Sequence, residues 1–140
     1  MSHTVDIPKE LKDSLRKFRF ARRSQGSAAL VIRINKSKLI MEEVEQLESI
    51  SIEELAEELP DHSPRYVVLS YELKHKDGRT SFPLVLINWA PPACETSMLT
   101  LHASALIDFQ TTADVSKVIE MRDGPEGLTK EIIDTKLLSA

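Results

Sequence analysis

The sequence predicts a single α+β domain over residues 1–140, with a central β-hairpin between layers of helix. The hairpin spans residues 65–90, where apolar residues alternate at period two along the first strand and both faces of its start are apolar. Its second strand, Leu84 to Trp89, is apolar on both faces, so a layer of structure must cover each side. Helices predicted near residues 8–23, 96–110 and 126–138 can supply those layers.

The N-terminal helix is predicted from Pro8 to about Arg23. Proline suits a first helical turn, and the buried stripe at i, i+4, i+7 spacing is Leu11, Leu15 and Phe18. The rest of this helix is strongly basic, and a solvated face explains most of its charges. The cluster of Arg19, Arg22 and Arg23 exceeds what the dipole of a helix favours at its C-terminus.

A further hairpin is predicted before the central one. Its first strand runs from Ala28 to Asn35, a turn follows over residues 35–38, and the second strand continues from Leu39. The outer face of the second strand is acidic, which we interpret as protection of an exposed sheet edge; the residues are Glu42, Glu43, Glu45 and Glu48. A capping box over residues 51–54 then predicts a short acidic helix, which Pro60 ends.

Two positions refine the central hairpin, whose far end is expected to protrude into water. Asp77-Gly78 is a dipeptide that supplies the positive φ angles of a type I′ turn, so it predicts that turn between the two strands. Pro83 cannot donate a backbone hydrogen bond. It therefore predicts a bulge or an unpaired position just before the second strand.

A long helix is predicted from an N-cap at Thr96 or Ser97 to about Gln110. Its core stripe is His102, Ala105, Leu106 and Phe109. Its opposite face, with small residues that let another backbone come close, is Thr100, Ala103, Ser104 and Ile107. We expect His102 to be a core histidine with one hydrogen-bond partner. A short strand over 117–122 and a last helix over 126–138, buried through Leu128, Ile132 and Leu137, complete the prediction.

Charge is segregated along the chain, although the net charge is only −4. Residues 1–40 carry ten Lys and Arg against three acids, and residues 41–64 carry nine acids and no Lys or Arg. This distribution favours oriented docking on a charged protein surface over nucleic-acid binding, which prefers a basic domain. No apolar run is long enough for a membrane helix and the N-terminus has no apolar leader, so we expect an intracellular protein that does not bind membranes.

No residue pattern indicates an enzyme, a cofactor or a metal site. The four histidines are scattered without metal-ligand spacing, and the single cysteine, Cys94, excludes an internal disulfide and a cysteine-based zinc site. The sequence contains no Gly-x-Ser-x-Gly elbow, phosphate-binding loop or dinucleotide fingerprint. An alternative to a protein-binding function is an enzyme or a small-molecule-binding domain that uses His102 or Cys94. This alternative predicts a polar cleft beside one of these residues.

Several segments, in collinear order over nearly the whole chain, resemble the actin-depolymerising-factor homology family and, within it, the glia maturation factor subfamily. They are Leu15 to Phe20, Glu58 to Pro60, Pro64 to Val68, Ser70 to Glu72, Asp77 to Arg79, Ser81 to Leu84 and Lys117 to Arg122. The resemblance implies a five-stranded mixed sheet with helices on both faces. It also implies a non-enzymatic, monomeric protein of the cytoplasm and the cortical branched-actin cytoskeleton, with the nucleus as a further location.

The resemblance implies that the protein binds the actin-related protein 2/3 complex, inhibits actin nucleation and promotes debranching. The long helix would insert its face of Thr100, Ala103, Ser104 and Ile107 into the cleft of an actin-related subunit, with Arg19, Arg22 and Arg23 beside it. A second implied surface, for a neighbouring subunit, is Lys76, Asp77, Arg79, Lys117 and Glu131. Ser2 is the implied phosphorylation site.

The long helix departs from the family pattern at one place. Relatives commonly have Met-Tyr-Ala followed by a basic residue, whereas this chain has Leu101-His102-Ala103 followed by Ser104. Without basic residues there, the resemblance implies weak or no direct binding to actin. The alternative is a cofilin-like protein that binds actin monomers and filaments and severs the filaments.

Overall fold

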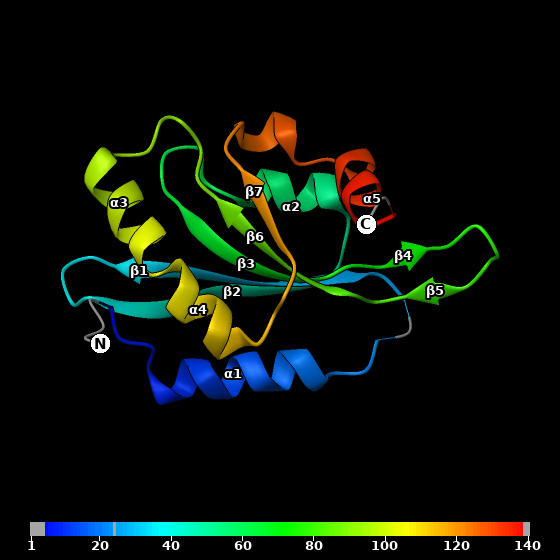
Figure 1. The fold of residues 1–140 in the computed structure, drawn as a ribbon, viewed down its shortest axis with the longest axis horizontal. Helices are drawn as coiled ribbons and strands as arrows, with labels where there is room; N and C mark the ends of the chain where they lie inside the picture. The colour runs from blue at the N-terminus through cyan, green and yellow to red at the C-terminus, as the bar shows by residue number, and fades with distance from the viewer. Residues whose placement is uncertain (1–4, 24, 139–140) are drawn as a thin grey trace.

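The computed structural model describes residues 5–23 and 25–138, and its centre is a twisted five-stranded sheet (Figure 1). The strand order is β2-β1-β3-β6-β7. The strands are β1 (Ser27–Asn35), β2 (Ile40–Ile50), β3 (Arg65–Ser70), β6 (Leu84–Trp89) and β7 (Val118–Met121). Neighbouring strands are antiparallel except for β6 and β7, which are parallel, so the sheet is mixed as expected.

Helices cover both faces of this sheet (Figure 1). One face packs against α1 (Lys9–Phe20), α3 (Thr96–Ser104) and α4 (Leu106–Ala113). The other face packs against α2 (Ile52–Glu58) and α5 (Lys130–Leu138). Each face of the sheet has its own hydrophobic core, and successive residues of a strand point to opposite faces. Leu30 therefore packs in the core with α1, whereas Val31 packs in the core with α2. The predicted α+β class and layer arrangement are confirmed.

The N-terminal hairpin of β1 and β2 also agrees with its prediction. β2 lies at the edge of the sheet, where a strand has backbone groups that could pair with another chain. Its glutamates lie along this edge and disfavour such pairing. The register shifts twice along β1 and β2, between Ser27 and Ala29 and between Val31 and Ile32. The predicted capping box opens α2: the Ser51 hydroxyl accepts from the Glu54 N–H at 3.1 Å, and the Glu54 carboxylate accepts from the Ser51 N–H at 3.0 Å.

The central hairpin consists of a sheet part and a projecting arm. β3 and β6 pair from Arg65↔Trp89 to Ser70↔Leu84. Beyond them the chain forms a separate two-stranded sheet, β4 (Leu73–Lys74) and β5 (Thr80–Ser81), which extends away from the body (Figure 1). Pro83 lies between β5 and β6, outside both ladders, as predicted.

The predicted type I′ turn at the tip of the arm is wrong. Gly78 has a φ of 92°, but Asp77 is not among the described residues with positive φ, and a type I′ turn needs both. The His75 N–H donates to the Arg79 carbonyl at 2.9 Å and the Gly78 N–H to the His75 carbonyl at 3.0 Å. The loop therefore has three residues, a turn followed by glycine at positive φ. The Asp77 carboxylate supports it by accepting from the Arg79 N–H at 3.1 Å.

Two predicted helices have different boundaries. The first helix ends at Phe20 rather than Arg23, because Ala21 has the extended backbone angles φ −66° and ψ 136°. The last segment is a 3-10 turn over Gly124–Gly127 followed by α5, so buried Leu128 lies before the helix rather than in it. The Thr129 hydroxyl accepts from the Ile132 N–H at 3.3 Å, and such a cap places the helix start at residue 130.

The predicted long helix is divided at Ala105 into α3 and α4, and its N-cap is Glu95 rather than Thr96 or Ser97. The Tyr66 hydroxyl of β3 donates to the backbone carbonyl of His102, one turn before the break. A side chain that binds a helix carbonyl competes with the helical hydrogen bonds, and we attribute the break to this contact.

Candidate partner-binding surfaces

Aromatic stacking holds α3 and α4 against the sheet. The Tyr66 ring stacks on His102 with centroids 3.9 Å apart and on Phe109 with centroids 4.7 Å apart. His102 Nε2 lies 2.6 Å from Asn88 Oδ1, which confirms the expected core histidine with a hydrogen-bond partner. Burial lowers the pKa of His102 to about 4, with a smaller contribution from the positive charge of Arg65. The ring is therefore neutral at pH 7.

The outer face of α3 and α4 stays exposed despite the break. Thr100, Ala103, Ser104 and Ile107 are all exposed, as the sequence predicts for the face opposite the core stripe. Ile107 is the largest apolar residue of the four, and 67% of its surface is exposed. The Ser104 hydroxyl donates to the Leu101 carbonyl at 2.8 Å, so it adds little polarity to the face. These four side chains carry no charge, and together they form the first candidate surface.

The three arginines predicted beside this surface lie in three different environments. Arg19 forms an ion pair with Asp114, the residue that ends α4, and its guanidinium lies over the Phe20 ring at 4.3 Å. Arg19 thus adjoins the first candidate surface. Arg22 lies beyond the end of α1, is exposed, and has no ion pair within the described chain.

Arg23 is turned inward, whereas its neighbour Arg22 is exposed. Its side chain is only 10% exposed, pairs with Glu48 Oε1 at 3.0 Å and lies over the Phe18 ring at 4.6 Å. Its Nε and Nη2 are buried without a hydrogen-bond partner. The ion pair of Arg23 with Glu48 therefore links the loop after α1 to β2. In this conformation the Arg23 side chain is not accessible to a partner.

Phe20 belongs to the same region, and the sequence analysis missed it as a site residue. It is 63% exposed at the end of α1, beside Arg19. The signal was present, because Phe20 lies two positions after Phe18 and therefore falls off the buried stripe of the helix. An exposed aromatic residue next to arginines is typical of the anchors of protein interfaces.

The residues predicted for a second surface come from the arm, from α5 and from the segment before β7. Lys76, Asp77 and Arg79 form the tip of the arm, where Asp77 and Arg79 pair at 2.6 Å. Glu131 is exposed on α5, and α5 adjoins the base of the arm, because the Tyr71 hydroxyl donates to Asp134. Lys117 precedes β7, and its backbone carbonyl accepts from the Leu86 N–H of β6 at 2.8 Å. The arm and α5 form the second candidate surface, and Lys117 lies beside the start of β6, at the end of the sheet from which the arm extends. Ser2 lies outside the described residues.

Comparisons with known proteins agree with this architecture. The family model described as cofilin/tropomyosin-type actin-binding protein matches residues 4–138. Human glia maturation factor beta is 39% identical over 132 residues, which cover 94% of this chain and 92% of that protein. Glia maturation factor of Drosophila melanogaster is 34% identical over 132 residues, with 94% of each chain covered. The chain belongs to the cofilin/ADF family of actin-regulatory proteins, in its glia maturation factor branch.

Solved structures of this family show the same fold. The solution structure of glia maturation factor from Caenorhabditis elegans superposes with a TM-score of 0.80 at 32% identity, covering 97% of this chain and 99% of that chain. Plasmodium berghei actin depolymerization factor 2 superposes with a TM-score of 0.83 over the full length of both chains at 12% identity, which concerns the fold alone. The fold is thus shared across the family, while the higher identity is to the glia maturation factors.

Among the residues that the structure describes, no hydrogen bond joins Cys94 to a histidine. Cys94 is buried, and burial raises the pKa of its thiol. Beside His102 there is a hollow of about 250 Å³, lined by Asn88, Ala90, Leu99, His102, Ala103 and Arg122, but the His102 Nε2 already binds Asn88. Within residues 5–23 and 25–138, no group of three His, Cys, Asp or Glu side chains could hold a metal ion. None of the described helices is long and apolar enough to cross a membrane.

Proposed function

We propose that this protein binds the actin-related protein 2/3 complex, inhibits nucleation of new filaments and promotes debranching of existing ones. The observation that carries the proposal is the uncharged outer face of α3 and α4, from Thr100 to Ile107, with Arg19 and Phe20 beside it. A helix face with small residues and one apolar side chain fits the cleft of an actin-related subunit. The similarity to glia maturation factors over nearly the whole chain supports the same assignment.

The two candidate surfaces suggest how debranching works. The first surface would dock in the cleft of the actin-related subunit, while the arm and α5 would contact a neighbouring subunit. A ligand shifts an equilibrium only if it binds the two states with different affinity, so the protein must bind the released complex more tightly than the branched one. We place the protein, as a monomer, in the cytoplasm at cortical branched-actin sites, with the nucleus as a further location.

The second candidate function is cofilin-like binding and severing of actin itself. The matching family model describes actin-binding proteins, which favours it. The exposed face of α3 argues against it, because Ser104 stands where the resemblance places a basic residue after Met-Tyr-Ala in relatives. Co-sedimentation with pure actin filaments separates the two functions: substantial binding without the complex would support the cofilin-like alternative.

Replacing Ile107 by aspartate should weaken binding to the actin-related protein 2/3 complex by roughly tenfold or more, because a charge would enter an apolar contact. Stability should change little, since 67% of the residue is exposed. Val44→Asp is the matched control: Val44 is 44% exposed but lies on edge strand β2. Binding is measured by pull-down of the purified complex. Equal binding by the wild type and the Ile107→Asp variant would remove the α3–α4 face from the proposal.

The double variant Arg19→Ala and Arg22→Ala should bind the complex several-fold more weakly and debranch filaments more slowly. Both arginines are at the surface, and the exposed Arg19–Asp114 pair stabilises the fold by less than about 1 kcal/mol, so the melting temperature should be nearly unchanged. The rate of branch loss is measured by fluorescence microscopy. Unaltered debranching by this folded variant would contradict the role assigned to these arginines.

A further inference from the structure

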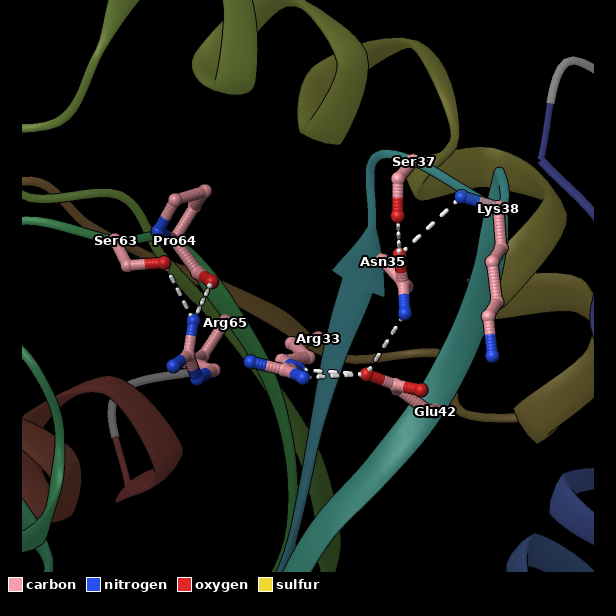
Figure 2. A network of polar contacts seen from close by, with 8 residues as sticks. All are labelled: Arg33, Asn35, Ser37, Lys38, Glu42, Ser63, Pro64 and Arg65. Atoms are coloured by element: carbon pink, nitrogen blue, oxygen red, sulfur yellow. Dashed lines mark hydrogen bonds and ion pairs between the residues drawn. The ribbon is translucent and has the colours of Figure 1, made fainter.

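Three cationic side chains that belong to neither candidate surface form a basic patch at one end of the sheet (Figure 2). They are Arg33, Lys38 and Arg65. β1 and β3 pair at Ile32↔Tyr66, so Arg33 and Arg65 occupy the next opposed positions and face the same side of the sheet. Like charges directly opposite each other in a sheet are destabilising. The pairing of β1 with β3 therefore does not by itself favour two arginines at these positions.

Within the described chain, Glu42 is the one carboxylate that pairs with the basic patch. Glu42 of β2 accepts from Arg33 through Nε at 2.8 Å and Nη2 at 2.6 Å, and these hydrogen bonds lower the pKa of Glu42. Arg65 uses only neutral acceptors, because its Nη1 donates to the Ser63 hydroxyl at 2.7 Å and the Pro64 carbonyl at 2.8 Å. Within the described chain, neither Arg65 nor Lys38 has an ion pair. Positive charge is therefore in excess.

The basic patch is also held in place before any ligand arrives. Ser63 and Pro64 fix one end of the Arg65 guanidinium, while Glu42 fixes Arg33 (Figure 2). The turn that carries Lys38 is held by Asn35, whose side-chain oxygen accepts from the Lys38 N–H at 3.2 Å. Arg65 is half-buried, and both burial and the nearby Arg33 lower its pKa. An anion bound between the two arginines would relieve that electrostatic cost.

We propose that the basic patch binds an acidic segment of a protein partner, one carboxylate of which bridges Arg33 and Arg65. Guanidinium groups match the planar geometry of carboxylates. The surroundings favour a short segment over a polyanion such as nucleic acid, because the exposed carboxylate of Asp61 adjoins the patch in the loop before β3. This inference adds a third surface and does not rest on the proposed function.

Titration of the full-length protein with a capped tetraglutamate peptide tests the proposal. The Nε–H resonances of Arg33 and Arg65, followed by NMR, should shift together and saturate at the same peptide concentration. The Arg65→Gln variant should lose roughly tenfold in apparent affinity, and its Arg33 resonance should then shift little, because the two groups share one ligand. Arg79→Gln, an exposed arginine at the tip of the arm, is the matched control and should bind like the wild type.

Three outcomes would overturn the proposal. The first is a shift at Arg33 and Arg65 no larger than that at Arg79, which would indicate unspecific charge attraction. The second is unchanged peptide affinity in a folded Arg65→Gln variant, with folding verified from its amide spectrum. The third is tighter, saturable binding of inorganic phosphate than of the peptide, which would make the patch a phosphate site. If Arg65→Gln fails to fold, Arg33→Gln provides the same comparison and should also weaken peptide binding.

Discussion

Replacing Tyr66 by alanine should reduce the free energy of unfolding by about 3 to 5 kcal/mol, the range for removing a large aromatic side chain from a core. The Tyr66 side chain is fully buried and stacks on both His102 and Phe109. Its hydroxyl also donates to the His102 carbonyl. Removing this ring would therefore detach α3 and α4 from the sheet as well as leaving a cavity. Urea unfolding followed by circular dichroism measures the loss.

Tyr66→Phe is the control that separates the ring from the hydroxyl. It keeps both stacking contacts and leaves the buried His102 carbonyl without this donor, which should cost about 1 to 3 kcal/mol. If the α3–α4 face is the binding surface, the alanine variant should also bind the complex more weakly than the phenylalanine variant under conditions where both are folded. A Tyr66→Ala variant as stable as the wild type would contradict the assignment of this ring to the core.

Acidification should destabilise the protein through His102 before most carboxylates titrate. The folded state holds this ring neutral, with a pKa lowered from 6.5 to about 4. The unfolded chain therefore binds the proton first, and stability is fully present above pH 6.5 and falls as the pH drops toward 4. The full shift corresponds to about 3 kcal/mol. Urea midpoints measured between pH 7.5 and 4.5 should decrease steadily over this window.

His102→Gln is the control for the pH effect. Glutamine retains hydrogen-bonding capacity toward Asn88 but does not titrate, so the variant should show a much flatter dependence between pH 6.5 and 4.5. Carboxylates with lowered pKa, such as Glu54 and Asp134, add their own loss of stability, which falls mainly at lower pH. The same pH dependence in the variant and in the wild type would show that another group controls acid stability.

Local patterns in the sequence were sufficient for most of the fold. Alternation at period two assigned the strand residues to their cores, and the doubly apolar stretch from Leu84 to Trp89 required the helices found on both sides. The stripe of His102, Ala105 and Phe109 placed the buried and exposed faces of α3 and α4 correctly. These features depend on which side chains must leave water, and that information is carried by residues close together in the chain.

Element ends and turns were less predictable because they depend on partners distant in sequence. The break at Ala105 requires the Tyr66 hydroxyl, which comes from β3. The three-residue loop at the arm follows from the register of β4 and β5, which the Asp77-Gly78 dipeptide does not determine. Likewise, the end of α1 at Phe20 separated arginines that a longer helix would have placed on one continuous surface.

The sequence by itself thus determined the layers, the faces of most elements and the candidate helix surface, because apolar periodicity is a local property. The last helix is an exception, because α5 buries Ile133, whereas the predicted Ile132 and Leu137 are only partly buried. Only the tertiary structure decided which charges are available to a partner. It turned Arg23 toward Glu48, paired Arg19 with Asp114 and left Arg22 and Phe20 exposed. It also brought Arg33 and Arg65 side by side from separate strands. Their electrostatic environment depends on strand register and burial, which no single stretch of the chain specifies.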